Sequence, residues 1–284
     1  MKAAVIAGGG SYGAYTVGRL FKTKPNYQVV NGCSTGALMA PLVALEQYDK
    51  LKDVYTSVTA EDIFSVNPFD SKGNLKIFNA LWRLTTGKKT LGETQSLYKL
   101  IQSSFPEKEF NRLNKTGKKV IITVCNISKT YNNTEYVTNE ECSYENFIKF
   151  MLASASVPLI GSIVEINGQE YVDGGTTEAL PLLKTLQYKP QEVDCYLHDT
   201  EPVSSSKQNV KNIFNLGGRV FNISKTEMQK DNLLTGLLQS ELIQPCKVRT
   251  SYLPQNFPVN ALVFNEELMT EWFNLGYNTA NDWK

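Results

Sequence analysis

The chain has 284 residues, of which 42% are hydrophobic, and its 29 Lys and Arg nearly balance 28 Asp and Glu. This length suits one large α/β domain, and the hydrophobic share excludes a disordered chain. A net charge of +1 gives no general attraction to nucleic acid, so we expect no nucleic-acid partner.

The five cysteines and the single histidine limit the possible redox and metal chemistry. The cysteine number is odd, no CxxC pair occurs, and Cys125 and Cys195 lie in apolar runs, so we expect reduced thiols in a cytoplasmic protein. These residues do not have the spacing of a tetrahedral zinc site, so no metal is predicted. No stretch approaches 18 apolar residues, and the first apolar run is too short for a signal peptide, so we predict no membrane span.

A strand, a glycine-rich loop and a helix open the chain. The apolar run at residues 2–7 predicts a strand buried on both faces. Gly8, Gly10 and Gly13 match the G-x-G-x-x-G pattern of a dinucleotide site, which also needs an acidic residue about 20 positions later to bind the ribose. No Asp or Glu occurs before Glu46, which argues against a dinucleotide cofactor.

Two other interpretations of this loop remain. In one, the backbone N–H groups of Gly9 and Gly10 point at the oxygen that becomes negative during acyl transfer, and so form an oxyanion hole. In the other, the glycines only permit a tight turn. We prefer the oxyanion hole and assign Gly8, Gly9, Gly10 and Gly13 to it.

The stretch from Gly32 to Gly36 reads G-x-S-x-G, with an apolar run before it and helix-forming residues after it. This order predicts a strand, a sharp turn and a helix, with Ser34 presented outward at the turn. The glycines avoid Cβ clashes in so tight a turn, and the helix N-terminus favours developing negative charge. The pattern therefore predicts a serine nucleophile, and the alternative is that Ser34 only caps the helix.

Residues 37–55 have a helical pattern, and residues 60–115 combine turns with amphipathic stretches. We interpret 60–115 as a cap-like helical insertion within a single domain that spans residues 1–284. Phe78 and Trp82 fall at helical spacing among basic residues, which suits contact with lipid headgroups. We prefer the interpretation that this helix packs on the protein's own core.

The rest of the chain is predicted to alternate strands and helices. We expect strands at 118–127, 134–138, 163–166, 169–172, 193–197, 246–253 and 260–264, and helices at 144–155, between about 210 and 243, and at 266–281. Asn167-Gly168 predicts a hairpin with a type I′ turn, and residues 201–209 are expected to form a loop.

The predicted hairpin ends at Asp173, which is followed by Gly174 and Gly175. Asp173 is a candidate base for Ser34, although an aspartate in this position is also an ordinary turn residue. The order Ser34, Asp173, His198 is that of the α/β-hydrolase triad, so a histidine base stays an alternative.

Four motifs in this chain together resemble those of the patatin-like phospholipases. The motifs are Gly8–Gly13, Gly32–Gly36, Ala153–Pro158 and Asp173–Gly175. Their order and spacing agree with that family over residues 1–185, and the remainder agrees loosely. The resemblance implies a three-layer α/β/α fold with a central mixed sheet.

The same resemblance implies acyl-ester hydrolysis of phospholipids or lysophospholipids, with no metal and no cofactor. In that family the glycine loop is the oxyanion hole, the elbow serine is the nucleophile and the aspartate of the last motif is its base. This assigns a Ser34–Asp173 dyad, in which His198 has no catalytic role. The motif glycines are Gly32, Gly36, Gly174 and Gly175. A lipid substrate and peripheral contact with a membrane are the partners expected.

Two points stay open at this stage. The family usually carries Arg or Lys before the last glycine of the first motif, where this chain has Tyr12. The missing positive charge at Tyr12 affects the expected preference for phospholipids more than the expected hydrolysis reaction. A module of the same fold that binds a lipid or a partner protein with little turnover is the alternative function.

Overall fold

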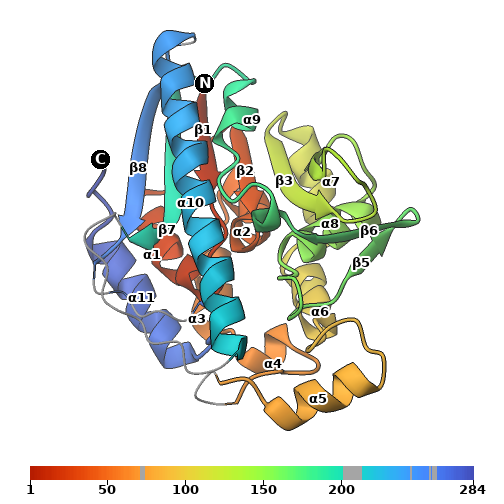
Figure 1. The fold of residues 1–284 in the computed structure, drawn as a ribbon. Coiled ribbons are helices and arrows are strands. Elements are labelled where there is room, and N and C mark those ends of the chain that lie inside the picture. Colours follow the sequence, from red (N-terminus) through yellow and green to blue (C-terminus); the bar gives the residue numbers. More distant parts are fainter. Residues whose placement is uncertain (71–73, 201–212, 244, 256, 258–260) are drawn as a thin grey trace.

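A mixed β-sheet lies between two layers of helices in the computed structural model of the chain (Figure 1). The structure describes residues 1–70, 74–200, 213–243, 245–255, 257 and 261–284. The loop expected at 201–209 lies outside these ranges. The fold is the three-layer α/β/α arrangement that the sequence predicts.

The strands within the described ranges form one eight-stranded sheet in the order β5-β6-β3-β2-β1-β7-β8, with β4 paired on β3. They are β1 Lys2–Ile6, β2 Val29–Cys33, β3 Lys119–Asn126, β4 Thr134–Thr138, β5 Val164–Ile166, β6 Gln169–Asp173, β7 Glu192–Thr200 and β8 Lys247–Leu253. Strands β3, β2, β1, β7 and β8 are mutually parallel, and β4, β5 and β6 add antiparallel pairs. The carboxyl ends of the parallel strands therefore meet at one edge, where sheets of this kind bind ligands.

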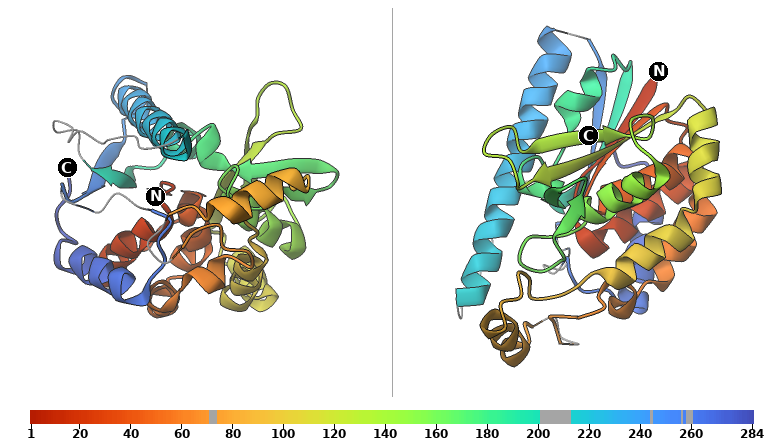
Figure 2. Two further views of the ribbon diagram at one scale, coloured as in Figure 1. Left: turned by 60° about the horizontal axis from the view of Figure 1, so that its bottom comes forward. Right: turned by 90° about the vertical axis from the view of Figure 1, so that its right-hand side faces the viewer.

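The larger helical layer contains α1, α2, α3, α8 and α11, and the smaller layer contains α9 and α10 (Figure 2). The helices are α1 Gly13–Thr23, α2 Thr35–Ala44, α3 Tyr48–Ser57, α4 Ala60–Ile63, α5 Ile77–Thr85, α6 Gln95–Ser104, α7 Glu107–Lys115, α8 Tyr144–Ser154, α9 Leu182–Leu186, α10 Ile213–Leu242 and α11 Glu266–Asn278, with short 3-10 helices η1 Gly10–Tyr12 and η2 Gly174–Thr176. None of the helices in the described ranges is both long and apolar enough to cross a lipid bilayer.

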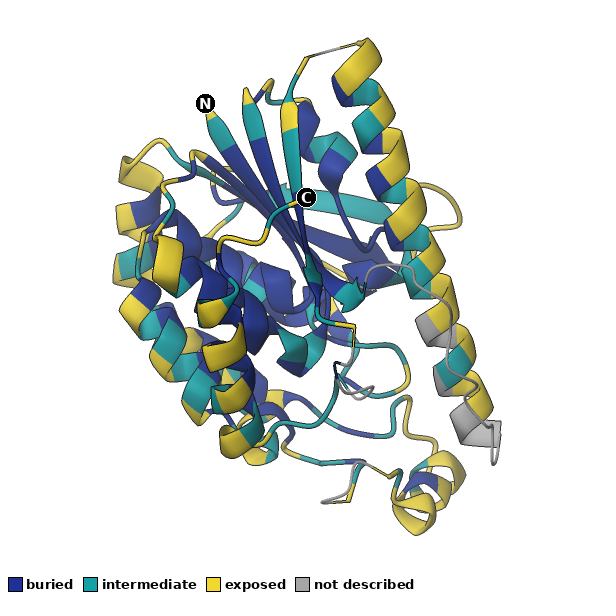
Figure 3. Ribbon diagram, turned by 90° about the vertical axis from the view of Figure 1, so that its left-hand side faces the viewer, coloured by how far each residue is buried: buried dark blue, intermediate teal, exposed yellow. Residues whose placement is uncertain are grey.

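A separate hydrophobic core lies on each face of the sheet, and both are dark in the burial view of Figure 3. Ala4 and Ile6 of β1 belong to the core under the larger layer, whereas Ala3 and Val5 belong to the core under α9 and α10. Successive side chains of a strand face opposite sides of the sheet. A strand covered on both faces is therefore apolar at every position, which is why the run at residues 2–7 predicts its own burial.

The local turn signals of the sequence are confirmed. Residues Asn167 and Gly168 have φ values of 51° and 76° and join β5 to β6 in an antiparallel hairpin. Both positive φ values are those of the type I′ turn that Asn-Gly favours. The strand expected at 134–138 pairs with β3, and the strand expected at 246–253 is β8.

Two predicted elements differ from the structure. The helical pattern at 37–55 forms two helices, α2 and α3, because the chain turns between them at Glu46, whose φ is 58°. Residues 261–264 form no strand. The apolar side chains that suggested a strand there pack instead, since the ring of Phe264 lies 6.4 Å from that of Phe64.

The segment at 60–115 contains helices of two kinds. Helices α6 and α7 bury apolar side chains in the larger core, but α5, at the bottom of Figure 1, buries only Ala80. Phe78 is 88% exposed and Trp82 is 71% exposed, so the expectation that this helix packs on the protein's own core is wrong for its aromatic side chains. Two isolated backbone bridges pair segments that flank α5 with each other, Val66 with Glu93 and Phe69 with Leu75, and the apolar face of α5 stays exposed.

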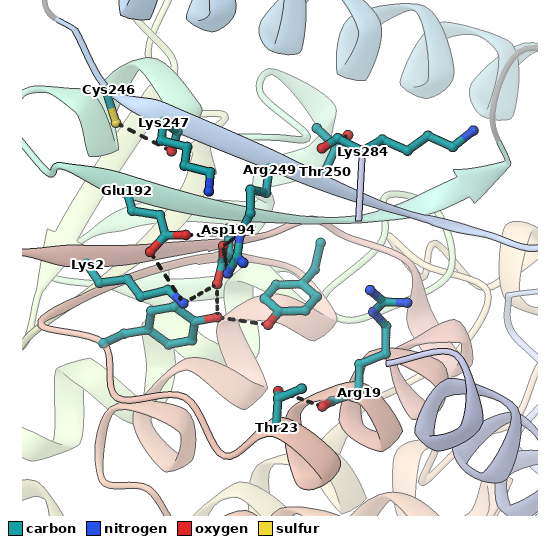
Figure 4. Close-up of polar contacts among 12 residues, drawn as sticks. Lys2, Arg19, Thr23, Glu192, Asp194, Cys246, Lys247, Arg249, Thr250 and Lys284 are labelled. Atoms are coloured by element: carbon teal, nitrogen blue, oxygen red, sulfur yellow. Dashed lines mark hydrogen bonds and ion pairs between the residues drawn. The ribbon is translucent and has the colours of Figure 1, made fainter. Parts of the chain in front are cut away.

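A buried carboxylate joins three strands near their amino ends (Figure 4). Asp194 of β7 is 1% exposed and lies 3.0 Å from the Lys2 ammonium of β1. It also accepts hydrogen bonds from Arg249 of β8 at 2.8 Å and from the Tyr27 hydroxyl at 2.6 Å. One side chain thus fixes the relative positions of β1, β7 and β8 at the edge opposite the carboxyl ends.

Replacing Asp194 with Asn should destabilise the protein strongly, because two cations would lose their buried counter-charge. Loss of a hydrogen bond to a charged group typically costs about 1.5–3 kcal/mol of unfolding free energy. Glu192→Gln is the matched control, because Glu192 contacts the same two cations at 3.8 and 3.1 Å but its side chain is 29% exposed. The control should cost no more than about 1 kcal/mol. Urea denaturation measures both changes, and equal losses would contradict the role given to burial.

Candidate active site

Ser34 lies in a strained turn between β2 and α2. Its φ of 54° and ψ of −123° are rare for a residue with a side chain. The turn is close-packed, because a Cβ added to Gly36 would lie 2.0 Å from the carbonyl oxygen of Ile6, and the Ser34 amide donates to Ser154 Oγ at 2.9 Å. The Ser34 side chain makes no capping hydrogen bond to the described helix, so the simple N-cap interpretation fails.

Asp173 ends β6, and the predicted hairpin brings it beside the elbow. Its side chain is 4% exposed, and Oδ1 accepts a hydrogen bond from the Gly175 amide at 2.7 Å. Burial raises the pKa of Asp173 to about 6, although hydrogen bonding from the Ser34 side chain and from the Gly175 amide lowers it. A carboxylate with this pKa is ionised at neutral pH and basic enough to accept a proton. Its bond to Gly175 also stabilises the turn, so the two interpretations of Asp173 are compatible.

The glycine loop approaches Ser34 closely. A Cβ on Gly8 would lie 2.9 Å from Ser34 Cβ. Gly10 has a φ of 54°, and a Cβ there would lie 2.0 Å from the carbonyl oxygen of Ala261. No backbone hydrogen bond to the Gly9 amide occurs within the described chain, and Gly10 begins η1, whose first amides have no partner inside the helix. Among the described residues, the Gly9 and Gly10 amides thus have no backbone acceptor, and both glycines line the same cavity as Ser34.

The other predicted glycines lie where backbones or helices meet. Gly13 begins α1, and a Cβ on it would lie 2.4 Å from a methionine side chain of α2. A Cβ on Gly32 would lie 2.2 Å from the carbonyl oxygen of Gly36, and one on Gly174 would lie 2.2 Å from a carbonyl oxygen of β3. These contacts set the distance between the elbow, the loop and the turn after Asp173.

His198 packs against the glycine loop, and both of its ring nitrogens have partners away from the dyad. It lies within β7, which continues beyond the predicted end of that strand. Nδ1 is 2.9 Å from the carbonyl oxygen of Ala7 and therefore carries the proton, while Nε2 is 2.9 Å from the Thr16 hydroxyl. Burial lowers the pKa of His198 to about 3, so the ring is neutral. A Cβ on Gly9 would lie 2.2 Å from His198 Cβ, so the histidine supports the loop.

An apolar cavity of about 880 Å³ opens onto these groups. Ser34, Asp173, the glycine loop and His198 form one part of its wall. Helices α2, α3, α6 and α8 contribute apolar side chains to another part, among them Leu38, Leu42, Val54, Leu97, Ile101 and Met151. The volume is within the usual range for small-molecule sites, and the lining suits an acyl chain.

Two features of the wall do not follow from any sequence motif. The Tyr12 ring packs edge-on against the rings of Phe257 and Trp272, at centroid distances of 5.4 and 5.7 Å. Where the related family usually has Arg or Lys, this chain thus places an aromatic contact in place of a cation. Lys225 and Arg219 of α10 line the cavity instead. No sequence signal could have identified them, because α10 reaches the site only through the packing of the smaller layer.

Three comparisons relate the chain to known proteins. The family model for patatin-like phospholipase matches residues 4–186. "Probable lipid hydrolase 463L" of Invertebrate iridescent virus 6 is 24% identical over 225 residues, which cover 74% of this chain and 73% of that protein. The crystal structure of VipD from Legionella pneumophila aligns with a TM-score of 0.41 and 13% identity. That alignment covers 98% of this chain and 66% of VipD, so the chain spans slightly less than two thirds of it.

The rate at which a fluorophosphonate labels Ser34 should rise with pH through an apparent pKa of about 6. Only the ionised Asp173 carboxylate can accept the hydroxyl proton, so labelling should fall as the pH drops below this value. His198, with a pKa of about 3, stays neutral over the same pH range, so it adds no second pH-dependent change in the labelling rate. Labelling rates between about pH 4.5 and 8, with the modified peptide identified by mass spectrometry, test this. If a folded Asp173→Asn protein showed the same rise in labelling rate near pH 6, the assignment of this rise to Asp173 would be wrong.

Proposed function

Because the chain belongs to the patatin-like phospholipase family, we propose that it is a serine acyl hydrolase that cleaves fatty-acyl esters of phospholipids or lysophospholipids. One observation carries the proposal: the Ser34 hydroxyl lies in a strained turn, interacts with the buried Asp173 carboxylate, and faces an apolar cavity. The viral relative's name agrees with a lipid substrate.

The proposed reaction begins when the ester carbonyl lies between Ser34 and the glycine loop. Asp173 accepts the Ser34 proton as Oγ attacks the carbonyl carbon, and the Gly9 and Gly10 amides donate to the new oxyanion. The intermediate collapses when the leaving alcohol takes the proton from Asp173. A water molecule then attacks the acyl-enzyme while Asp173 accepts a proton from it, and Asp173 returns that proton to Ser34 Oγ as the fatty acid leaves.

Ser34→Ala and Asp173→Asn should each lower kcat on a soluble p-nitrophenyl ester by about 10⁴-fold or more, because losses of this size follow removal of a serine hydrolase nucleophile or its base partner. His198→Asn keeps a donor for the Ala7 carbonyl and should lose about tenfold or less, the value of one neutral hydrogen bond.

Ser103→Ala is the control for these variants, because Ser103 is an exposed serine on α6 and should behave as wild type. Circular dichroism establishes that each variant is folded. A folded His198→Asn enzyme as inactive as Asp173→Asn would replace the dyad by a triad. A wild type without turnover would favour the lipid- or partner-binding module.

The exposed apolar face of α5 is the proposed membrane contact. Within this helix, Ile77, Phe78, Leu81, Trp82 and Leu84 are 49–88% exposed. Isolated exposed apolar residues are ordinary, but a cluster on one helix indicates a binding surface. Ile77 also lines the cavity, so the surface borders the entrance to the site. Some nearby cations are already paired, since Arg83 bonds to Glu93 at 2.9 Å, and contact would depend mainly on the apolar face.

Replacing both Phe78 and Trp82 with Ser should weaken binding to anionic vesicles by about tenfold or more, because two large apolar side chains would no longer enter the lipid. Hydrolysis of a soluble short-chain ester should be spared. Leu238→Ser with Leu242→Ser is the control, since these residues are 49% and 79% exposed at the far end of α10. Vesicle co-sedimentation measures binding, and equal effects of the two double variants would overturn the assignment to α5.

A further inference from the structure

The middle of α10 is attached to the carboxyl end of β7, next to the dyad. The Thr226 hydroxyl donates to Asp199 Oδ2 at 2.5 Å. This contact brings Lys225, the neighbouring residue of α10, into the cavity wall that also contains Ser34 and Asp173. The position is set by the packing of two distant segments, and it places a cation in the same cavity wall as Asp173.

No described residue supplies a direct counter-charge to the Lys225 ammonium. It is partly buried, and burial lowers its pKa, while Asp173 and Asp199 raise it through space. Within the described residues, no hydrogen bond is found for this ammonium and no carboxylate lies within 4.0 Å of it. The nearby carboxylates bond elsewhere, Asp173 to the Gly175 amide and Asp199 to Thr226. A partly desolvated charge without a contact partner is unfavourable, so an anionic ligand would stabilise it.

A second cation lies in the same wall. Arg219 precedes Thr226 by seven residues, which places both on one face of α10, about 10 Å apart along its axis. Arg219 also has no hydrogen bond or ion pair to the described residues. The lining of the cavity therefore combines apolar side chains from α2, α3 and α6 with two cations from α10, and it also contains Ser34 and Asp173.

We propose that Lys225, assisted by Arg219, binds the phosphate of the lipid substrate, so that the enzyme prefers acyl esters of phosphate-bearing lipids over neutral glycerides. This inference rests on the proposed function. In a lysophospholipid only the glycerol unit separates the ester from the phosphate. With the ester carbonyl at Ser34, the phosphate lies within one glycerol unit of Ser34, and Lys225 is a cation of the same cavity that interacts electrostatically with Asp173. Lys and Arg are the usual phosphate ligands of proteins.

The inference is tested by binding, with Ser34→Ala protein that cannot turn the ligand over. Lysophosphatidate and a monoacylglycerol of the same chain length are titrated separately below their micellar concentrations. The Ser34→Ala protein should bind lysophosphatidate more tightly, and adding Lys225→Met should reduce that preference by about 10- to 100-fold, the value of a charge-assisted hydrogen bond. Lys225→Arg should retain most of it. Lys230→Met is the matched control, because Lys230 is on the same helix but pairs with Glu227 at 2.7 Å in solvent.

Each outcome decides the inference. An unchanged preference in Lys225→Met, or a loss of affinity that is equal for both lipids, would overturn it. Inorganic phosphate, titrated as the third ligand, should bind far more weakly than lysophosphatidate, and equal affinity would indicate a free-phosphate site instead. Binding is measured without catalysis. Absence of turnover in the wild type would therefore contradict the proposed hydrolase activity without changing the measured lipid preference. Thermal unfolding of each variant establishes that the fold is retained.

Discussion

The docking of α2 on β1 and β2 is the contact on which the rest of the site depends. At this junction backbones meet directly, since added Cβ atoms on Gly32 and Gly36 would lie 2.2 and 2.0 Å from carbonyl oxygens. The contact leaves Ser34 in a positive-φ conformation and brings the loop after β1 alongside it. The distance between the proposed nucleophile and the glycine amides is therefore set by the main chain, which is the stiffest part of the fold.

Burial favours the neutral form of three ionisable groups in this site, Asp173, His198 and Lys225. It raises the pKa of Asp173 to about 6 and lowers the pKa values of His198 and Lys225. The consequences differ, because Asp173 remains ionised at neutral pH while His198 becomes a neutral hydrogen-bonding group. The proposed carboxylate base and the neutral imidazole that supports the glycine loop thus owe their pKa values mainly to the same desolvation.

The two ends of the parallel strands differ: the buried ion pairs lie near the amino ends, and the candidate active site lies at the carboxyl ends. At the amino ends, Asp194 joins three strands through ion pairs with Lys2 and Arg249. At the carboxyl ends, the cations of the cavity wall form no ion pair with the described residues, and the Gly9 and Gly10 amides have no backbone acceptor among them.

The sequence alone determined the features that depend on neighbouring residues. The Asn167-Gly168 hairpin, the strands covered on both faces and the elbow at Ser34 follow from short-range sterics and from side-chain alternation. The three-layer arrangement with a mixed sheet was predicted from the resemblance of four motifs to a known family. Tertiary structure decided what depends on distant segments. The role of His198 rests on partners about 180 residues away, and Lys225 enters the site through helix packing. The exposure of Trp82 was likewise not encoded locally, because an amphipathic pattern shows that a helix has an apolar face but not what covers it.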